Sequence, residues 1–179
     1  MVLTTEQIKL LQDYRDKSYI LSVLCNECSE YYSFIRSCIT VPIILSSSIM
    51  TILNSYNKIN SDDLQISNII LNSSTALILS LSSNLKLNEK IINFKNISQK
   101  MNKYCSHIED ILTNHLSEIT NDEITKYIDD FNNINEQIEF PFIGYIKERI
   151  KKKYQGNKTL PNQLNCITSF VVFDNSNKV

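Results

Sequence analysis

Glycine, alanine and tryptophan are scarce in this chain, whose 179 residues include two glycines, one alanine and no tryptophan. Loops that cradle phosphate groups need several glycines, so most nucleotide-binding loops of that kind are excluded. The Gly-x-Ser-x-Gly and His-Glu-x-x-His motifs are also missing. These absences predict a protein that is not an enzyme and that uses no cofactor.

An excess of charge of either sign is missing as well. Lysine and arginine number 18, aspartate and glutamate 19, and the formal net charge is -1. A dedicated nucleic-acid binder normally carries a strong basic excess, so no nucleic-acid partner is expected. Apolar residues make up 42% of the chain, which is enough to bury a core and argues against wholesale disorder.

Two long stretches contain no charged residue. Residues 37–57 form an uncharged run of 21, and residues 64–85 form one of 22. A helix rises about 1.5 Å per residue, so about 20 residues cross a hydrocarbon core of roughly 30 Å. The connector 58–63 is short and polar, as two antiparallel helices require. We therefore predict an antiparallel transmembrane helical hairpin, with a soluble bundle of very apolar helices as the alternative.

Basic residues flank this hairpin unevenly. The first run is preceded by four, the connector holds Lys58, and five follow the second run within 18 residues. The flanking residues are Lys9, Arg15, Lys17 and Arg36, and then Lys86, Lys90, Lys95, Lys100 and Lys103. Positive residues concentrate on the cytoplasmic side of membranes. This predicts an integral membrane protein with both termini cytoplasmic and the connector on the opposite side. Charged residues among positions 4–16 predict that no secretory signal is present.

The second uncharged run is unusually polar for a spanning helix. Asn68 and Asn72 are four residues apart and therefore share a helix face, which favours a partner helix or water over acyl chains. Ser73 and Thr75 lie close by in sequence. We predict that Asn68, Asn72, Ser73 and Thr75 form a polar seam, which lines a pore if several hairpins associate.

Helical periodicity continues outside the hairpin. Apolar residues recur every three or four positions in 4–35, and a second stripe predicts one unbroken helix from about 64 to 116 that packs on the first. Thr120 to Glu123 is a capping box that starts a helix ended by Pro141, and a short helix follows up to Gly156. The expected fold is thus all-α: a transmembrane hairpin continued by long amphipathic cytosolic helices that pack as a bundle.

These predictions divide the chain into six parts, followed from the N-terminus. They are an N-terminal amphipathic helix (1–36), a first transmembrane helix (37–57), a connector (58–63), a second transmembrane helix (64–85), a cytosolic helical region (86–155) and a polar tail (156–179). The tail contains one apolar stretch, 170–173, which predicts a strand or a docked extension.

The short helix before Gly156 carries a dense basic cluster. Its members are Lys147, Arg149, Lys151, Lys152 and Lys153. An apolar stripe beside basic residues is typical of an interfacial helix bound to anionic headgroups, where each basic residue contributes about 1 kcal/mol. An ordinary helix with a solvated basic face, or a patch for a protein partner, explains the pattern equally well.

Cys25 and Cys28 are the one pair with a spacing typical of metal or redox sites. Residues three apart on a helix share a face, but a zinc site needs two further ligands, and Cys105 with His107 is the only other pair to consider. No second Cys-x-x-Cys motif occurs. We interpret both thiols as small apolar fillers of a helix interface and expect no bound metal.

The order of these segments resembles that of the SLATT family of two-span membrane proteins, in particular members encoded by large DNA viruses. The resemblance rests on Ile39-Thr40-Val41-Pro42-Ile43-Ile44-Leu45-Ser46-Ser47, on the junction Leu85-Lys86-Leu87-Asn88-Glu89-Lys90, and on Pro141 before a basic helix. It covers roughly residues 8 to 160. It implies a non-catalytic protein that oligomerises and perturbs membranes, triggered by another protein.

Three functions follow as hypotheses. The first is a two-span membrane protein whose helices self-associate as a homo-oligomer in the lipid bilayer, as a pore-forming or membrane-perturbing effector. The second is a virion or membrane scaffold that tethers a membrane to a protein shell. The third is a soluble helical bundle that binds other proteins.

Overall fold

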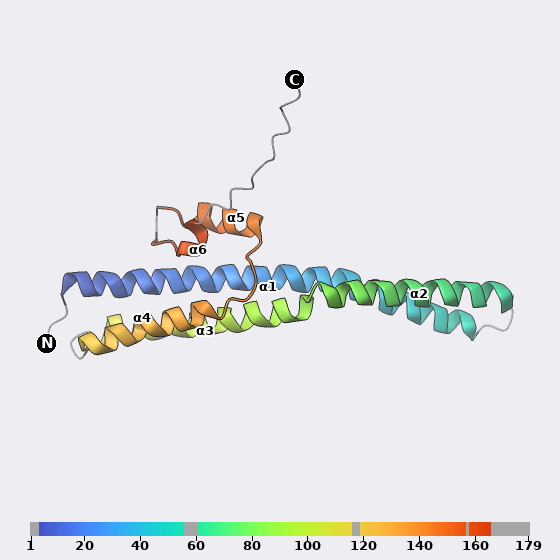
Figure 1. Ribbon diagram of the computed structural model, residues 1–179, viewed down its shortest axis with the longest axis horizontal. Helices are drawn as coiled ribbons and strands as arrows, with labels where there is room; N and C mark the ends of the chain where they lie inside the picture. The colour runs from blue at the N-terminus through green and yellow to red at the C-terminus, as the bar shows by residue number, and fades with distance from the viewer. Residues whose placement is uncertain (1–3, 56–60, 116–118, 157, 166–179) are drawn as a thin grey trace, which may run out of the picture.

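The structure, a computed structural model, describes residues 4–55, 61–115, 119–156 and 158–165. These parts contain helices α1 (Thr5–Asn54), α2 (Ser61–Asn84), α3 (Leu87–Asn114), α4 (Asn121–Glu136) and α5 (Gly144–Tyr154), and a short α6 (Asn162–Asn165). Helix α1 runs the length of the molecule, with α2 and α3 following each other along it in the opposite direction (Figure 1). The predicted all-α class and the antiparallel packing of two long helical stretches are confirmed.

Helix α1 is one continuous helix of 50 residues. It begins in a capping box, in which Gln7 N donates to Thr4 Oγ1 at 3.3 Å and Thr4 N donates to Gln7 Oε1 at 2.9 Å. It continues through Pro42 without a break in the helical backbone. The segments expected as an N-terminal helix and a first transmembrane helix are therefore two halves of a single element.

A line of small side chains brings α1 and α3 close together. Ser98 Oγ donates to the Ser22 carbonyl oxygen at 2.9 Å, and Ser22 Oγ donates to the Ser98 carbonyl oxygen at 3.1 Å. Further along, Ser29 Oγ donates to the Ile91 carbonyl oxygen at 3.2 Å. Buried hydroxyls reach the backbone of the opposite helix only where the helix axes are near each other. We call Ser22, Ser29 and Ser98 the serine seam.

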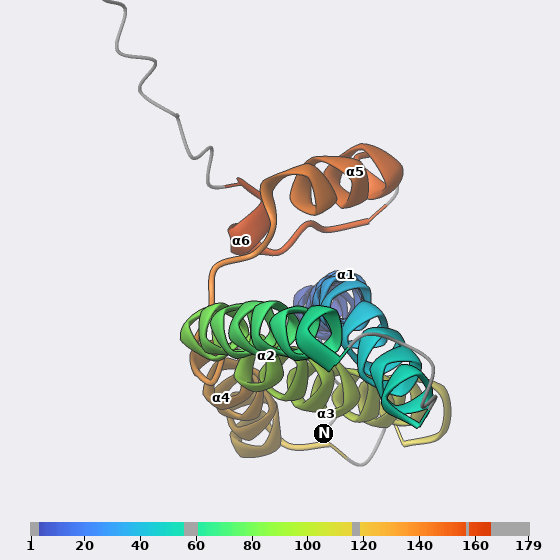
Figure 2. The same ribbon diagram turned by 90° about the vertical axis from the view of Figure 1, so that its right-hand side faces the viewer.

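The serine seam also sets the register of the antiparallel pair. Seven residues forward on α1, from Ser22 to Ser29, correspond to seven residues backward on α3, from Ser98 to Ile91. Beside the seam lies the apolar core, which α4 and α5 close from two sides (Figure 2). Its largest fully buried side chains include Leu11, Ile20, Leu21, Leu24, Phe94, Ile97, Met101, Ile108, Ile146 and Ile150.

The single unbroken helix expected over 64–116 is wrong at one point, because α2 and α3 are separated at Leu85 and Lys86. Lys86 adopts φ 51° and ψ 38°, the left-handed region that a lysine rarely occupies. The last shielded residue of α2 is Ser82 and the first buried residue of α3 is Leu87. These two are five positions apart, whereas neighbours on one helix face are three or four apart. A regular helix would turn Leu87 away from α1, and the left-handed residue corrects this rotation.

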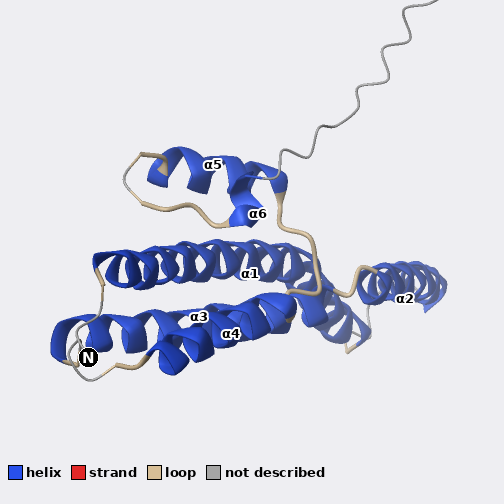
Figure 3. Cartoon of the chain, turned by 60° about the vertical axis from the view of Figure 1, so that its left-hand side comes forward, coloured by secondary structure: helices blue, strands red, loops and turns tan. Residues whose placement is uncertain are grey.

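Helices α4 and α5 complete the bundle beside α1 and α3 (Figure 3). The capping box expected at the start of α4 is confirmed, with Glu123 N donating to Thr120 Oγ1 at 3.4 Å and Thr120 N donating to Glu123 Oε2 at 2.8 Å. The expected end at Pro141 is wrong, because α4 stops at Glu136 and the Gln137 carbonyl oxygen instead accepts a bond from Asn93 Nδ2 at 2.9 Å.

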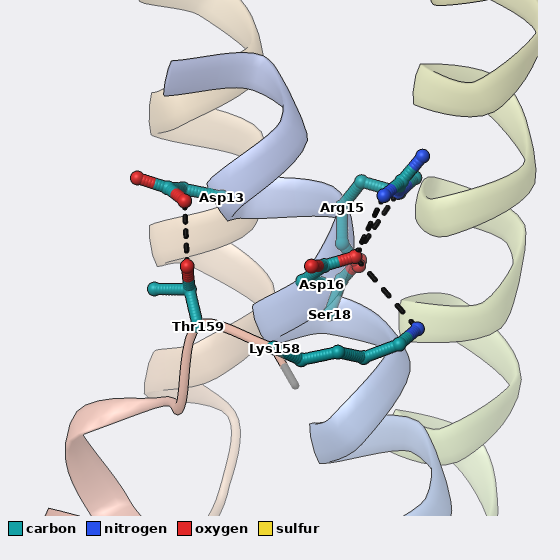
Figure 4. Close-up of polar contacts among 6 residues, drawn as sticks. All are labelled: Asp13, Arg15, Asp16, Ser18, Lys158 and Thr159. Atoms are coloured by element: carbon teal, nitrogen blue, oxygen red, sulfur yellow. Dashed lines mark hydrogen bonds and ion pairs between the residues drawn. The ribbon is translucent and has the colours of Figure 1, made fainter. Parts of the chain in front are cut away.

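The segment after α5 is tied to the N-terminal half of α1 (Figure 4). Thr159 Oγ1 donates to Asp13 Oδ1 at 2.6 Å. Lys158 Nζ lies 3.7 Å from a carboxylate oxygen of Asp16, which also receives Arg15 at 2.9 Å. These contacts hold the start of the polar tail against the bundle. The apolar stretch 170–173, expected as a strand or docked extension, lies outside the described residues.

Replacing Ser98 with leucine should destabilise the fold. The larger side chain has no room where α1 and α3 meet, and such overpacking typically costs about 1–3 kcal/mol. Thermal unfolding of the full chain, followed by far-ultraviolet circular dichroism, should show a lower midpoint for Ser98→Leu. Asn96→Leu is the matched control, because Asn96 is exposed on the same helix. Equal midpoints for the two variants would contradict the close serine seam.

Candidate functional site

Residues 37–54 of α1, helix α2 and the following Leu85 form a two-helix arm that extends beyond the bundle (Figure 1). Apolar side chains cover the outer surface of this arm, and twelve large ones are more than half exposed. They are Val41, Ile44, Leu45, Ile49, Ile52, Ile66, Ile69, Ile70, Leu77, Leu79, Leu81 and Leu85. A contiguous apolar surface of this kind marks a contact with a membrane or with another protein.

The helical stretches Thr5–Asn54 and Gln65–Asn114 are each long and apolar enough to span a membrane, judged by length and composition. Core helices of soluble proteins pass the same test, but they are mostly buried. In this chain the apolar windows are 6% and 0% buried. The apolar side chains of the arm therefore face outward instead of filling a core.

On the facing sides of the two helices, side chains shielded from solvent recur every three or four residues, or after seven. The shielded side chains on α1 are Ile39, Ile43, Ser46, Met50 and Leu53, and those on α2 are Asn68, Leu71, Thr75 and Ser82. This alternation is the pattern of two helices packed along one another. A groove of about 420 Å³ lies between them, lined by apolar side chains and by the hydroxyl-bearing Ser46, Ser67, Ser74 and Thr75.

An amide pair joins the two helices near the connector. Asn68 Nδ2 donates to Asn54 Oδ1 at 3.1 Å, and Asn54 Nδ2 donates back to Asn68 Oδ1 at 3.5 Å. The role of Asn54 was not foreseen from the sequence. The sequence does contain one indication of this pairing: Asn54 lies four residues before the connector 58–63 and Asn68 lies five residues after it, so an antiparallel hairpin brings them near each other.

The amide pair lies near one end of the uncharged layer, and Arg36 and Lys86 mark its other end. Arg36 and Asn54 are eighteen positions apart on one side of the arm, and Asn68 and Lys86 are eighteen positions apart on the other. At about 1.5 Å per residue, each path is roughly 27 Å long, close to the roughly 30 Å hydrocarbon core of a bilayer. Because the helices are antiparallel, Arg36 and Lys86 lie at one level and the amide pair lies at the other.

The residues predicted as a polar seam do not share one environment. Asn68 and Thr75 are half-buried on the face of α2 that packs on α1, and Asn68 is engaged with Asn54. Asn72 and Ser73 are exposed on the outside of the arm. The structure therefore divides the four residues into a half-buried inner pair, of which Asn68 is bonded to Asn54, and an exposed outer pair.

The basic cluster lies on α5, which packs lengthwise along α1. Ile146 and Ile150 are 1% and 0% exposed, so the apolar stripe of α5 is already covered by the bundle. An interfacial helix would need that stripe for lipid, so this interpretation does not fit the arrangement. Arg149 pairs with Glu27 of α1, while Lys152 and Lys153 are exposed, Lys147 and Lys151 being half-buried.

The lysine-rich end of α5 is also far from the uncharged layer. The Tyr154 and Tyr19 ring centroids are 6.0 Å apart, which places the last turn of α5 beside Tyr19 of α1. From Tyr19 to Arg36 is 17 residues, about 26 Å along a helix. Charges interact weakly with a surface beyond a Debye length of about 8 Å. This geometry favours the second alternative, a solvated or partner-binding basic face.

Cys25 and Cys28 lie in the core and are both 0% exposed. Burial raises the pKa of the Cys28 thiol to about 11, and burial likewise raises the pKa of Cys25. In the described part of the chain, no three histidine, cysteine, aspartate or glutamate side chains are grouped so that they could hold a metal ion. The environment of both thiols is that of apolar core residues.

Comparison with known proteins adds no relative: no protein-family model, curated protein or solved structure matches this chain.

Cys25 and Cys28 should resist alkylation in the folded protein. Iodoacetamide attacks the thiolate, and a thiol of pKa about 11 is only about one part in a thousand ionised at pH 8. Peptide mapping by mass spectrometry after brief treatment should find both cysteines unmodified, and modified once the chain is denatured. Rapid modification of either thiol in the native chain would contradict its burial.

Proposed function

We propose that this chain is a non-enzymatic membrane protein, whose two-helix arm crosses a lipid bilayer and whose copies associate with one another. The main observation in support of this proposal is the exposed apolar surface of the arm. Fully burying an isoleucine or leucine side chain yields about 1.5–3 kcal/mol. Twelve such side chains, each already partly covered, favour transfer of the arm into hydrocarbon by on the order of 10 kcal/mol.

The polar groups of the arm are compatible with this placement. Ser48 Oγ donates to the Ile44 carbonyl oxygen at 2.8 Å, and Thr51 Oγ1 donates to the Ser47 carbonyl oxygen at 2.9 Å. Hydroxyls bonded to their own helix need no water. The Asn54–Asn68 pair satisfies its amides within the hairpin and lies at the edge of the uncharged layer, where contact with water is available.

The charges at the two ends support an orientation. Arg36 and Lys86 lie at the end of the uncharged layer that faces the bundle, together with the other basic residues of α1 and α3. We therefore place the bundle and both termini in the cytoplasm and the connector 58–63 across the membrane. This order of elements is what supports similarity to the SLATT family, and membership of that family is part of the proposal.

Association of copies is supported by the outer face of α2. Asn72 is exposed there, and an amide facing acyl chains gains a hydrogen bond when a second hairpin covers it. Ser73 is exposed one position further along the helix. In a pore formed by several hairpins, Asn72 and Ser73 line the polar path, while Asn68 and Thr75 hold each hairpin together.

A lysine placed on the outer surface of the arm should weaken membrane integration. Ile44 and Ile92 are both 58% exposed, but Ile44 lies in the arm and Ile92 lies on α3. A lysine at the centre of a spanning helix costs about 2.5–3.5 kcal/mol. Alkaline carbonate extraction should release much more of Ile44→Lys than of Ile92→Lys or the natural chain.

The same membranes also test the orientation. Protease added to sealed vesicles that expose their cytoplasmic face should digest tags at both termini and spare a tag inserted in the connector. Full extraction of the natural chain by carbonate would refute the membrane proposal, and protection of either terminus would refute the orientation.

If the hairpins form a pore, replacing Asn72 and replacing Asn68 should have different effects. Asn72→Leu should abolish ion flux across liposomes and leave the hairpin intact, because Asn72 has an outward position. Asn68→Leu should instead reduce the thermal stability of the arm, since it removes both bonds to Asn54. A fluorescent ion-flux assay and thermal unfolding in detergent measure the two effects. Unchanged flux for Asn72→Leu would exclude the pore.

A further inference from the structure

The cytosolic bundle carries two helices of opposite charge. Helix α4 has five carboxylates and one lysine, a net charge of four negative units. Helix α5 has five basic residues and one glutamate, a net charge of four positive units. The chain as a whole is nearly neutral, so this separation within two short helices is a property of their surfaces and not of the composition.

The two charged surfaces do not neutralise each other within one chain. Helix α5 lies on one side of α1, and α4 lies on the other side together with α3 (Figures 1 and 3). Asp129 and Asp130 of α4 are exposed, and so are Lys152 and Lys153 of α5. None of these four side chains forms an ion pair within the described parts of the molecule.

The two surfaces lie at nearly the same level along the bundle. Tyr14 of α1 contacts Phe131 of α4, with ring centroids 5.1 Å apart, and Tyr19 contacts Tyr154 of α5, with centroids 6.0 Å apart. Five residues of α1 separate these two contacts, which is about 7.5 Å along the helix. Lysine side chains are long and flexible enough to bridge this offset.

We propose that α5 of one copy binds α4 of the next copy through these charges, so that the cytosolic bundles associate side by side. The proposal rests on the proposed membrane function, because insertion of the arms holds all copies at the same height and in the same orientation. Since the acidic and basic surfaces differ and lie on different sides, the contact is heterologous. Repetition of such a contact builds a ring or an open array.

A second copy fits these surfaces better than lipid does. The exposed lysines of α5 are about 26 Å from the level of Arg36, well beyond the Debye length of about 8 Å at physiological ionic strength. Anionic headgroups therefore exert little attraction on them. A neighbouring copy instead presents carboxylates at the matching height, which is the charge complementarity that directs protein association.

Charge reversal on the full chain tests this contact. One variant carries Lys152→Glu with Lys153→Glu, which makes the exposed pair on α5 acidic like Asp129 and Asp130 and brings the net charge of α5 to zero. The other carries Asp129→Lys with Asp130→Lys, which makes the exposed pair on α4 basic like Lys152 and Lys153 and brings the net charge of α4 to zero. Each variant alone should self-associate about tenfold or more weakly than the natural chain, whereas an equal mixture of the two should recover association to within about twofold.

Energy transfer between donor-labelled and acceptor-labelled copies in neutral phosphatidylcholine vesicles measures the association. The matched control carries Lys95→Glu with Glu109→Lys, which reverses two charges on α3 and should leave energy transfer unchanged. Natural association should also weaken in molar salt, because the Debye length falls to about 3 Å.

Several outcomes would overturn the proposed contact. They are unchanged association of both variants, failure of the mixture to recover, and a loss that appears only in vesicles containing phosphatidylserine, which would assign the lysines to lipid. Vesicle flotation of each variant is measured in parallel. Chains that fail to float refute the membrane function, whereas chains that float without recovering association in the mixture refute only the α4–α5 contact.

Discussion

The close antiparallel register of α1 against α2 and α3 is the constraint on which the other features depend. Serine hydroxyls that bond the backbone of the opposite helix hold this register within the bundle, at Ser22, Ser29 and Ser98. Residues bulkier than serine would separate the helices and remove these bonds. From the seam outward, the register places Asn54 opposite Asn68 and brings Arg36 and Lys86 to one level. A slip by one turn would misalign these two boundaries.

One helix serves two environments because its surface changes along its length. The first half of α1 buries side chains such as Leu21 and Leu24 against α3, α4 and α5. Residues 37–54 pack along α2 and keep Ile44 and Ile52 exposed. The number of covering helices therefore falls where the charge-free part of α1 begins. The left-handed Lys86 lies at this boundary, between α2 and α3, and lets each of these two helices turn its own packing face toward α1.

The bundle also determines how its charges are presented. The apolar stripe of α5 is occupied by α1, and the basic residues of α5 are consequently turned to the outside at a distance from the proposed membrane. The acidic side chains of α4 are presented in the same way on the opposite flank. Copies held in the proposed membrane orientation would display complementary charges at a common height, which would link the bundle to the self-association proposed for the arm.

Local signals in the sequence determined much of the secondary structure. The capping box at Thr120, apolar periodicity and the uncharged runs depend on neighbours within a few residues, so they indicated the helices and the antiparallel pairing of the long ones. Tertiary structure decided the rest. The break at Lys86 arises from the phase of two helix faces against α1, the partner of Asn68 is 14 residues away at Asn54, and the orientation of α5 follows from burial of Ile146 and Ile150. Each of these depends on contacts between helices, which periodicity within one segment does not encode.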